Sequence, residues 1–294
     1  MDEIILEILP PPQKWNSEQR DSYCCSVTQV IKNQNIRYVG VPEVVNESRE
    51  TERTVAYQHK IDNIEFIEQL KEYAPDLIPI PYKICVRATK SNFQEWIKQI
   101  YEKGYRHIVL VGGENHKIEY PGYTVLEAAR HIKEQFPLMK MGGIAIFTRH
   151  GEAKRILEKS QAGIDFFFSQ IVIEPFNMKQ ILHNLSKLCK EHKRGLPKIY
   201  VSLSLASQPK DIEFMKWLGV EFPTAVLDYF TCEEERQTLE ERSIETVEMI
   251  LDEIFHFMKN EGFDIGFNIE HIMYNNLYLS QKLHENIKQR IASA

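Results

Sequence analysis

Short apolar runs recur along the chain and alternate with longer segments of helical spacing. They number eight, at residues 4–9, 37–43, 77–85, 107–113, 142–148, 165–173, 198–205 and 264–272. The apolar residues within each run are nearly continuous and show no clean period of two. Both faces of each predicted strand should therefore be buried, as in a parallel sheet.

The segments between these runs predict helices. Residues 91–104 place apolar side chains on one face, with Ser91 as the predicted N-cap and Gly104 just beyond the last turn. Residues 124–137 form a second predicted helix, which ends at a proline. A third runs over residues 233–260, and its opening glutamates suit the positive end of the helix dipole.

Eight strand–helix units in 294 residues predict an α/β fold of the (β/α)8 TIM-barrel type. We expect one domain over residues 1–294, with an insertion near residues 218–232, where the connection is longer than needed. A doubly wound open sheet is the structural alternative. That fold would need a glycine-rich first turn, whereas the first predicted strand is followed by three prolines.

The composition is that of an ordinary globular protein, with 43% hydrophobic residues and a net charge of -6. A nucleic-acid surface needs clustered Lys and Arg, and the one basic cluster, at 190–194, lies where a predicted helix should end. No stretch approaches the ~20 apolar residues of a membrane span, and the first run is too short for a signal peptide. We therefore expect a cytoplasmic protein that binds neither nucleic acid nor a membrane.

Metal binding is not expected. The five cysteines lack C-x-x-C spacing and are odd in number, which fits neither a zinc ribbon nor a disulfide framework. His150 and His271 do not form an H-x-H or H-E-x-x-H pattern. The last two predicted strands are not followed by a glycine-rich phosphate loop, which disfavours a sugar-phosphate substrate.

Glu7 is the first candidate for chemistry, because it lies among aliphatic residues at the end of the first predicted strand. In a parallel barrel the site lies at the carboxyl ends of the strands. A poorly solvated carboxyl group there would have a raised pKa and could act as a general acid, worth roughly 10²–10⁴ in rate. Pairing with a Lys or Arg inside the barrel is the alternative.

Two further candidates follow later strands. Glu114 comes after Gly112 and Gly113, which would let a flat ligand approach the backbone, although a tight turn explains them equally. Gln170 lies within an otherwise apolar run, and its amide can both donate and accept at the edge of a ring. A structural hydrogen bond across the barrel would also account for Gln170, because an unpaired buried amide costs about 1–3 kcal/mol.

Four segments resemble the methylenetetrahydrofolate reductases, barrels that reduce a folate-carried one-carbon unit. LEILPPPQ is similar to their F-E-F-F-P-P-R, GYRHIVLVGGEN to G-I-R-H-I-V-A-L-R-G-D, RHGEAK to V-H-P-E-A-K, and QAGIDFFFSQIVIE to D-A-G-A-N-R-A-I-T-Q-F-F-F-D. The resemblance implies a TIM barrel that binds a reduced folate. It implies Glu7 as the acid toward the folate, and Glu114 and Gln170 as contacts of the pterin ring.

The flavin-binding segments of that family are matched less well. Its Arg-Gly-Asp reads Gly-Gly-Glu at 112–114, and the stretch between residues 154 and 161 is several residues shorter. The resemblance places His150, Lys159 and Tyr82 at cofactor-contacting positions, but a pyrophosphate needs more cationic or N–H partners. FAD is therefore disfavoured, and NAD(P)H is an alternative source of hydride.

The leading hypothesis is a barrel that binds 5-methyl- or 5,10-methylene-tetrahydrofolate, with reduction of the latter as the candidate enzymatic activity. A folate-binding or carrier protein without redox chemistry is one alternative. An unrelated barrel hydrolase or lyase that uses the carboxylates at the mouth is another. The sequence indicates neither an oligomeric state nor a protein partner.

Overall fold

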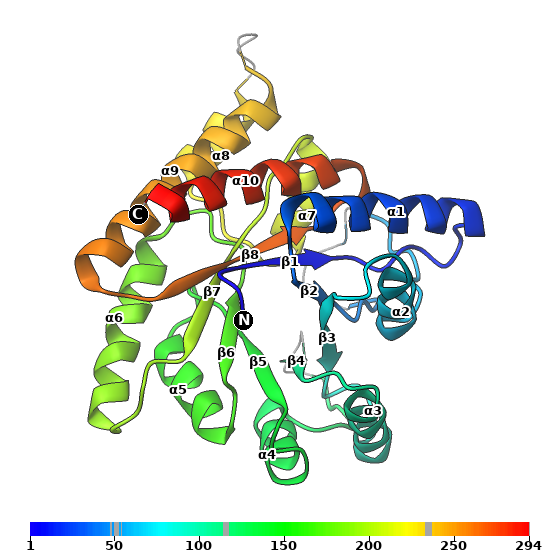
Figure 1. The fold of residues 1–294 in the computed structure, drawn as a ribbon. Helices are drawn as coiled ribbons and strands as arrows, with labels where there is room; N and C mark the ends of the chain where they lie inside the picture. Colours follow the sequence, from blue (N-terminus) through cyan, green and yellow to red (C-terminus); the bar gives the residue numbers. More distant parts are fainter. Residues whose placement is uncertain (48, 50–52, 54, 114–117, 233–236, 294) are drawn as a thin grey trace.

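The fold is a closed barrel of eight parallel strands in sequence order, which confirms the predicted TIM barrel (Figure 1). It was analysed as a computed structural model that describes residues 1–47, 49, 53, 55–113, 118–232 and 237–293. The strands are β1 Ile4–Ile8, β2 Tyr38–Val41, β3 Ile78–Ile84, β4 His107–Val111, β5 Lys140–Ala145, β6 Phe166–Ser169, β7 Lys198–Leu203 and β8 Ile265–His271. Each of the eight predicted apolar runs therefore contains a strand or most of one.

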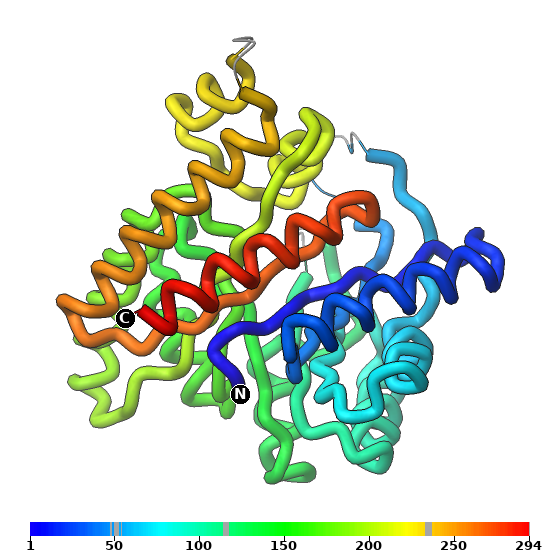
Figure 2. The backbone as a smooth tube through the Cα atoms, turned by 45° about the horizontal axis from the view of Figure 1, so that its top comes forward, coloured from blue at the N-terminus to red at the C-terminus, as the bar shows by residue number. Residues whose placement is uncertain are grey.

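Helices surround the barrel. They are α1 Ser17–Gln34, α2 Asn63–Tyr73, α3 Lys90–Glu102, α4 Val125–Gln135, α5 Glu152–Ala162, α6 Phe176–Glu191, α7 Pro209–Trp217, α8 Thr224–Thr231, α9 Leu239–Glu261 and α10 Leu277–Ser293, with a 3₁₀ turn, η1, at Tyr274–Asn276. Helix α10 packs on α1 and covers β1 and β8, as the tube in Figure 2 shows.

Helix α3 corrects the predicted N-cap. Thr89, not Ser91, caps this helix, because the Thr89 Oγ1 accepts a hydrogen bond from the backbone N–H of Asn92 at 3.3 Å. At the other end Gly104 has φ +86°, the left-handed conformation predicted for it.

The start of helix α9 also differs from the prediction. This helix begins at Leu239 rather than at residue 233, and the predicted opening glutamates lie outside the described residues. Thr238 and Glu241 form a reciprocal capping box, which is a stronger start signal than acidic residues alone. Residues 218–232 include the short helix α8, which packs on α9.

The barrel interior is filled by a layer of aromatic side chains. Phe166, Phe168 and Tyr200 pack edge to face, with ring centroids 5.4–6.2 Å apart. Glycines make room for them: a Cβ added at Gly142 would lie 2.5 Å from the Phe166 ring, and one at Gly266 would lie 2.5 Å from Tyr200. Open space is left above this layer, at the carboxyl ends of the strands.

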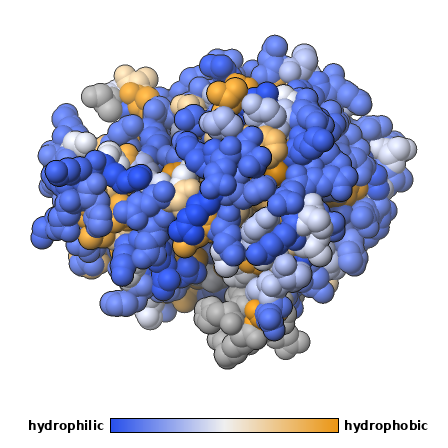
Figure 3. Space-filling view, turned by 90° about the horizontal axis from the view of Figure 1, so that it is seen from below, coloured by the Kyte–Doolittle hydropathy of each residue, from blue (hydrophilic) through white to orange (hydrophobic). Residues whose placement is uncertain are grey.

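The surface in Figure 3 is largely hydrophilic, with small and scattered hydrophobic patches. In the part of the chain that the structure describes, no helix combines the length and apolar character needed to cross a membrane.

Candidate functional site

A cavity of about 230 Å³ opens at the carboxyl ends of the strands. Its floor contains two carboxyl groups and aromatic rings, from Glu7, Tyr82, Phe168 and Glu270. Its rim is formed by the loop after β2 and by the end of α7, which contribute Arg49, Arg53, Phe214 and Trp217. The cavity lies where (β/α)8 barrels place their chemistry.

The Glu7 carboxylate is held by neutral donors at the end of β1. Its Oε2 accepts hydrogen bonds from the Tyr82 hydroxyl at 2.6 Å and from the Asn268 Nδ2 at 3.3 Å. Among the described residues no Lys or Arg pairs with it, so the predicted alternative of a cation partner is not found. Burial raises the pKa of Glu7, and the two hydrogen bonds only partly oppose that shift.

Glu270 is the second carboxyl group of the floor. It is the register partner of Glu7 on the neighbouring strand β8. Burial raises the pKa of Glu270 well above its usual range, and the nearby charge of Glu7 raises it further. Two adjacent carboxyl groups without a cation favour retention of a proton, so the floor can donate a hydrogen bond as well as accept one.

Because these pKa values are raised on folding, the pair should lower stability as the pH rises. Below the pKa of the unfolded state, each carboxyl group is protonated in both the folded and the unfolded protein. As the pH rises through the higher pKa values of the folded protein, the folded state loses stability relative to the unfolded state. We expect Glu270→Gln to melt at a higher temperature than the parent at pH 8, with a smaller gain at pH 5. Thermal melts at the two pH values measure this difference. Glu134→Gln, on the exposed face of α4, is the control, and an unchanged melting temperature of Glu270→Gln at pH 8 would contradict the assignment.

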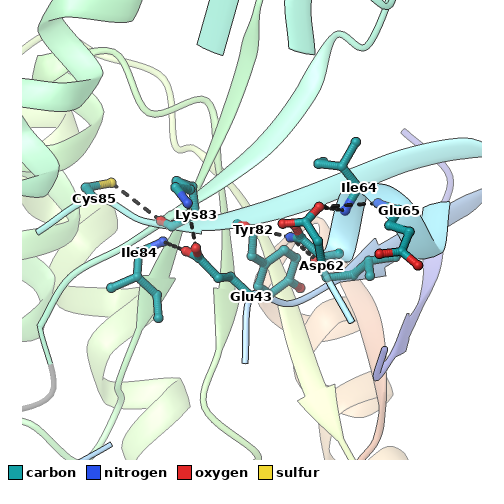
Figure 4. Close-up of polar contacts among 10 residues, drawn as sticks. Glu43, Asp62, Ile64, Glu65, Tyr82, Lys83, Ile84 and Cys85 are labelled. Atoms are coloured by element: carbon teal, nitrogen blue, oxygen red, sulfur yellow. Dashed lines mark hydrogen bonds and ion pairs between the residues drawn. The ribbon is translucent and has the colours of Figure 1, made fainter. Parts of the chain in front are cut away.

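Tyr82 is fixed by contacts between β3 and the segments beside it. The Asn63 Nδ2, in the first turn of α2, donates to the carbonyl oxygens of Val41 at 3.1 Å and Tyr82 at 2.9 Å. Glu43 accepts from the Lys83 Nζ at 2.5 Å and from the Ile84 N–H at 2.7 Å (Figure 4). The structure therefore orients the Tyr82 hydroxyl toward Glu7, whereas the sequence resemblance had placed Tyr82 with the cofactor.

Gln170 also lines the cavity, directly after β6. Its Nε2 donates to the Leu218 carbonyl at 3.0 Å, and its Oε1 accepts from the Ile171 N–H at 3.1 Å. Gln170 therefore has structural hydrogen bonds, but they join it to the end of α7 and to the next residue rather than across the barrel. The amide still has a second N–H and a second lone pair for a ligand. Gln170 also borders a second cavity of about 200 Å³, lined in part by Phe147, Glu174 and Glu221.

Two of the other predicted site residues, His150 and Lys159, lie away from the cavity that contains Glu7. Glu114 lies outside the described residues. His150 is exposed, and the Lys159 Nζ donates to the Ile144 carbonyl at 2.6 Å, with its pKa lowered by burial. Neither His150 nor Lys159 lines the cavity. The cofactor-contacting role that the resemblance gives to His150 and Lys159 stays a prediction.

Sequence reasoning did not select Glu270, Asn268 or the rim arginines. A usable signal exists for the first two, since Asn268 and Glu270 alternate with apolar residues in β8 and so share one face. Arg49 and Arg53 lie in the segment after the second strand, where mouth loops are expected, but their partner Trp217 is far along the chain.

The fold and its mouth cavity define the class, a (β/α)8 barrel with aromatic rings and carboxyl groups at its mouth. No family model and no curated protein matches the chain. Among solved structures it is similar to an uncharacterized protein from Clostridium thermocellum that binds two copies of 5-methyl-5,6,7,8-tetrahydrofolic acid. That match has 22% identity and a TM-score of 0.80, covering 97% of this chain and 95% of that one. Long-chain alkane monooxygenase LadA matches with 9% identity and a TM-score of 0.57, over 99% and 91%. These likenesses show the barrel fold.

Proposed function

We propose that this protein binds a reduced folate, 5-methyl- or 5,10-methylene-tetrahydrofolate, in the mouth cavity. The observation that carries the proposal is the pair Glu7 and Glu270, two carboxyl groups of raised pKa on the floor of an aromatic cavity. A pterin presents N–H donors and ring nitrogens along one edge, and such a pair can both accept from and donate to that edge. The ligand of the Clostridium thermocellum neighbour supports the same choice.

The aromatic rings on the floor of the cavity suit a flat heterocycle. The rings of Tyr82 and Phe168 lie nearly parallel, at 28°, with centroids 5.9 Å apart, and both line the cavity. Aromatic faces of this kind stack on planar ligands. Glu7 and Gln170 would then contact the polar edge of the pterin, from β1 and from the residue after β6.

Reduction of 5,10-methylene-tetrahydrofolate is the second candidate. The position of Glu7 favours it, because burial raises the pKa of this carboxyl group, and a carboxylic acid of raised pKa can act as a general acid toward a pterin nitrogen. Turnover with NADH or NADPH as the added reductant, with and without added FAD, tests this activity separately from binding.

Isothermal titration calorimetry with 5-methyl-tetrahydrofolate tests the proposed function. We expect saturable binding. The neighbour binds two copies of its ligand, and the fitted stoichiometry will show whether this chain binds one copy or has room for a second, for which the second cavity is the candidate. The absence of binding at millimolar ligand would contradict the proposal. Binding without turnover would support a carrier and exclude the reductase.

A further inference from the structure

Two arginines from the loop after β2 pack on Trp217 at the cavity rim. The Arg53 Cζ lies 4.2 Å from the centroid of the Trp217 ring, and the Arg49 Cζ lies 5.1 Å from it. Trp217 itself is buried at the end of α7, with 5% of its surface exposed. An aromatic face therefore fixes both guanidinium groups against one wall of the cavity.

The two arginines differ in their partners. Arg49 pairs with Glu47 at 2.6 Å and donates to the Leu218 carbonyl at 2.8 Å. The Arg53 Nε donates to the Val55 carbonyl at 2.7 Å, but its Nη1 is buried and has no hydrogen-bond partner among the described residues. A buried N–H without an acceptor is costly, so the Arg53 guanidinium has donor capacity that its contacts with the described residues do not use.

The carboxylates of the described residues near the cavity form their ion pairs with cations other than Arg53. The Glu43 carboxylate pairs with Lys83 at 2.5 Å, and Glu47 is taken by Arg49. Within the described residues no carboxylate forms an ion pair with Arg53. The rim of the cavity therefore has a cationic side chain on its Trp217 wall that a ligand carboxylate can pair with.

We propose that Arg53 binds the glutamate carboxylate of the folate while the pterin ring occupies the floor. This inference rests on the proposed function and adds the residue that recognises the acidic end of the ligand. A guanidinium presents two parallel N–H donors to a carboxylate, and the Trp217 ring already holds its plane in place. The ligand class is thereby narrowed to pterins that carry a carboxylate tail.

The test compares 5-methyl-tetrahydrofolate with its glutamate diamide, in which both carboxylates are neutral amides, by isothermal titration calorimetry. We expect Arg53→Gln to weaken folate binding about tenfold and to leave binding of the diamide within about twofold of the parent. Arg37→Gln is the matched control, since Arg37 precedes β2 at the opposite end of the barrel and its side chain is 60% exposed.

Each outcome decides the inference. An equal loss for both ligands would show that Arg53 only supports the loop, and no loss for either would show that it binds nothing; both results overturn the inference and leave the proposed function standing. If the parent binds neither ligand, the proposed function fails and the inference fails with it. A loss confined to the folate supports it.

Discussion

Replacement of Phe168 by alanine is expected to lower the free energy of unfolding by about 3–5 kcal/mol. Phe168 is 1% exposed and packs against Tyr82, Phe166 and Tyr200, with centroids 5.4–5.9 Å away. Removal of the ring leaves a space that strands on a closed barrel cannot collapse to fill, because every strand is held by two neighbours. Urea unfolding followed by circular dichroism measures the loss.

Phe176→Ala is the matched control for this variant. Phe176 begins helix α6 and is 57% exposed, so the same truncation there should change the unfolding free energy by no more than about 0.5 kcal/mol. A loss below about 1.5 kcal/mol for Phe168→Ala would mean that the barrel interior is less closely packed than the ring contacts indicate.

Glu7→Leu is expected to weaken binding of 5-methyl-tetrahydrofolate by about 10- to 100-fold, whereas Glu7→Gln should stay within about threefold of the parent. Glutamine has the shape of a protonated glutamate and can still donate and accept, and the Tyr82 hydroxyl can still donate to it. Leucine fills the same space without polar atoms. Calorimetric titration of both variants measures the difference.

The pair of variants separates the role of Glu7 in binding from its role in folding. Thermal melts establish that both variants are folded. Leucine matches the aliphatic residues that make up the rest of strand β1. Equal folate affinity in Glu7→Leu and the parent would remove Glu7 from the binding site. A large loss in Glu7→Gln would mean that the ionised carboxylate, and not the protonated form, contacts the ligand.

The fold could be predicted because its signal is local and repeated. Each strand of a parallel barrel is buried on both faces, so runs such as residues 4–9 and 198–205 are mostly apolar and show no alternation. Element ends were less well predicted where two signals competed. At the start of α9 the capping pair Thr238 and Glu241 prevails over the acidic residues before it.

The site could be predicted only in part, because its contacts join distant segments. Glu7 was identified from its own surroundings, as a carboxylate among aliphatic residues. Its neighbours Tyr82 and Asn268 are 75 and 261 residues away, and only the strand register brings them to its Oε2. The stacking of Arg53 on Trp217 likewise depends on how two mouth loops pack, which no local pattern reports.

The resemblance to the folate reductases predicted fold and ligand class from the same segments. The fold is confirmed, and the folate stays a proposal that a solved structure of similar fold supports. For the cofactor residues the resemblance predicted positions without geometry. The sequence indicates that Lys159 has too few cationic partners for a pyrophosphate. Its hydrogen bond to the Ile144 carbonyl is visible only in the structure.

The aromatic layer inside the barrel has a consequence for ligand exchange. Phe166 and Tyr200 border a separate hollow at the amino-terminal end of the strands, so the layer of Phe166, Phe168 and Tyr200 divides that end from the mouth. A molecule bound above the layer is therefore separated from the amino-terminal end and exchanges at the carboxyl ends of the strands. Association and dissociation rates should both depend on the side chains of the cavity rim, and substitutions there will alter residence time even where equilibrium affinity is unchanged.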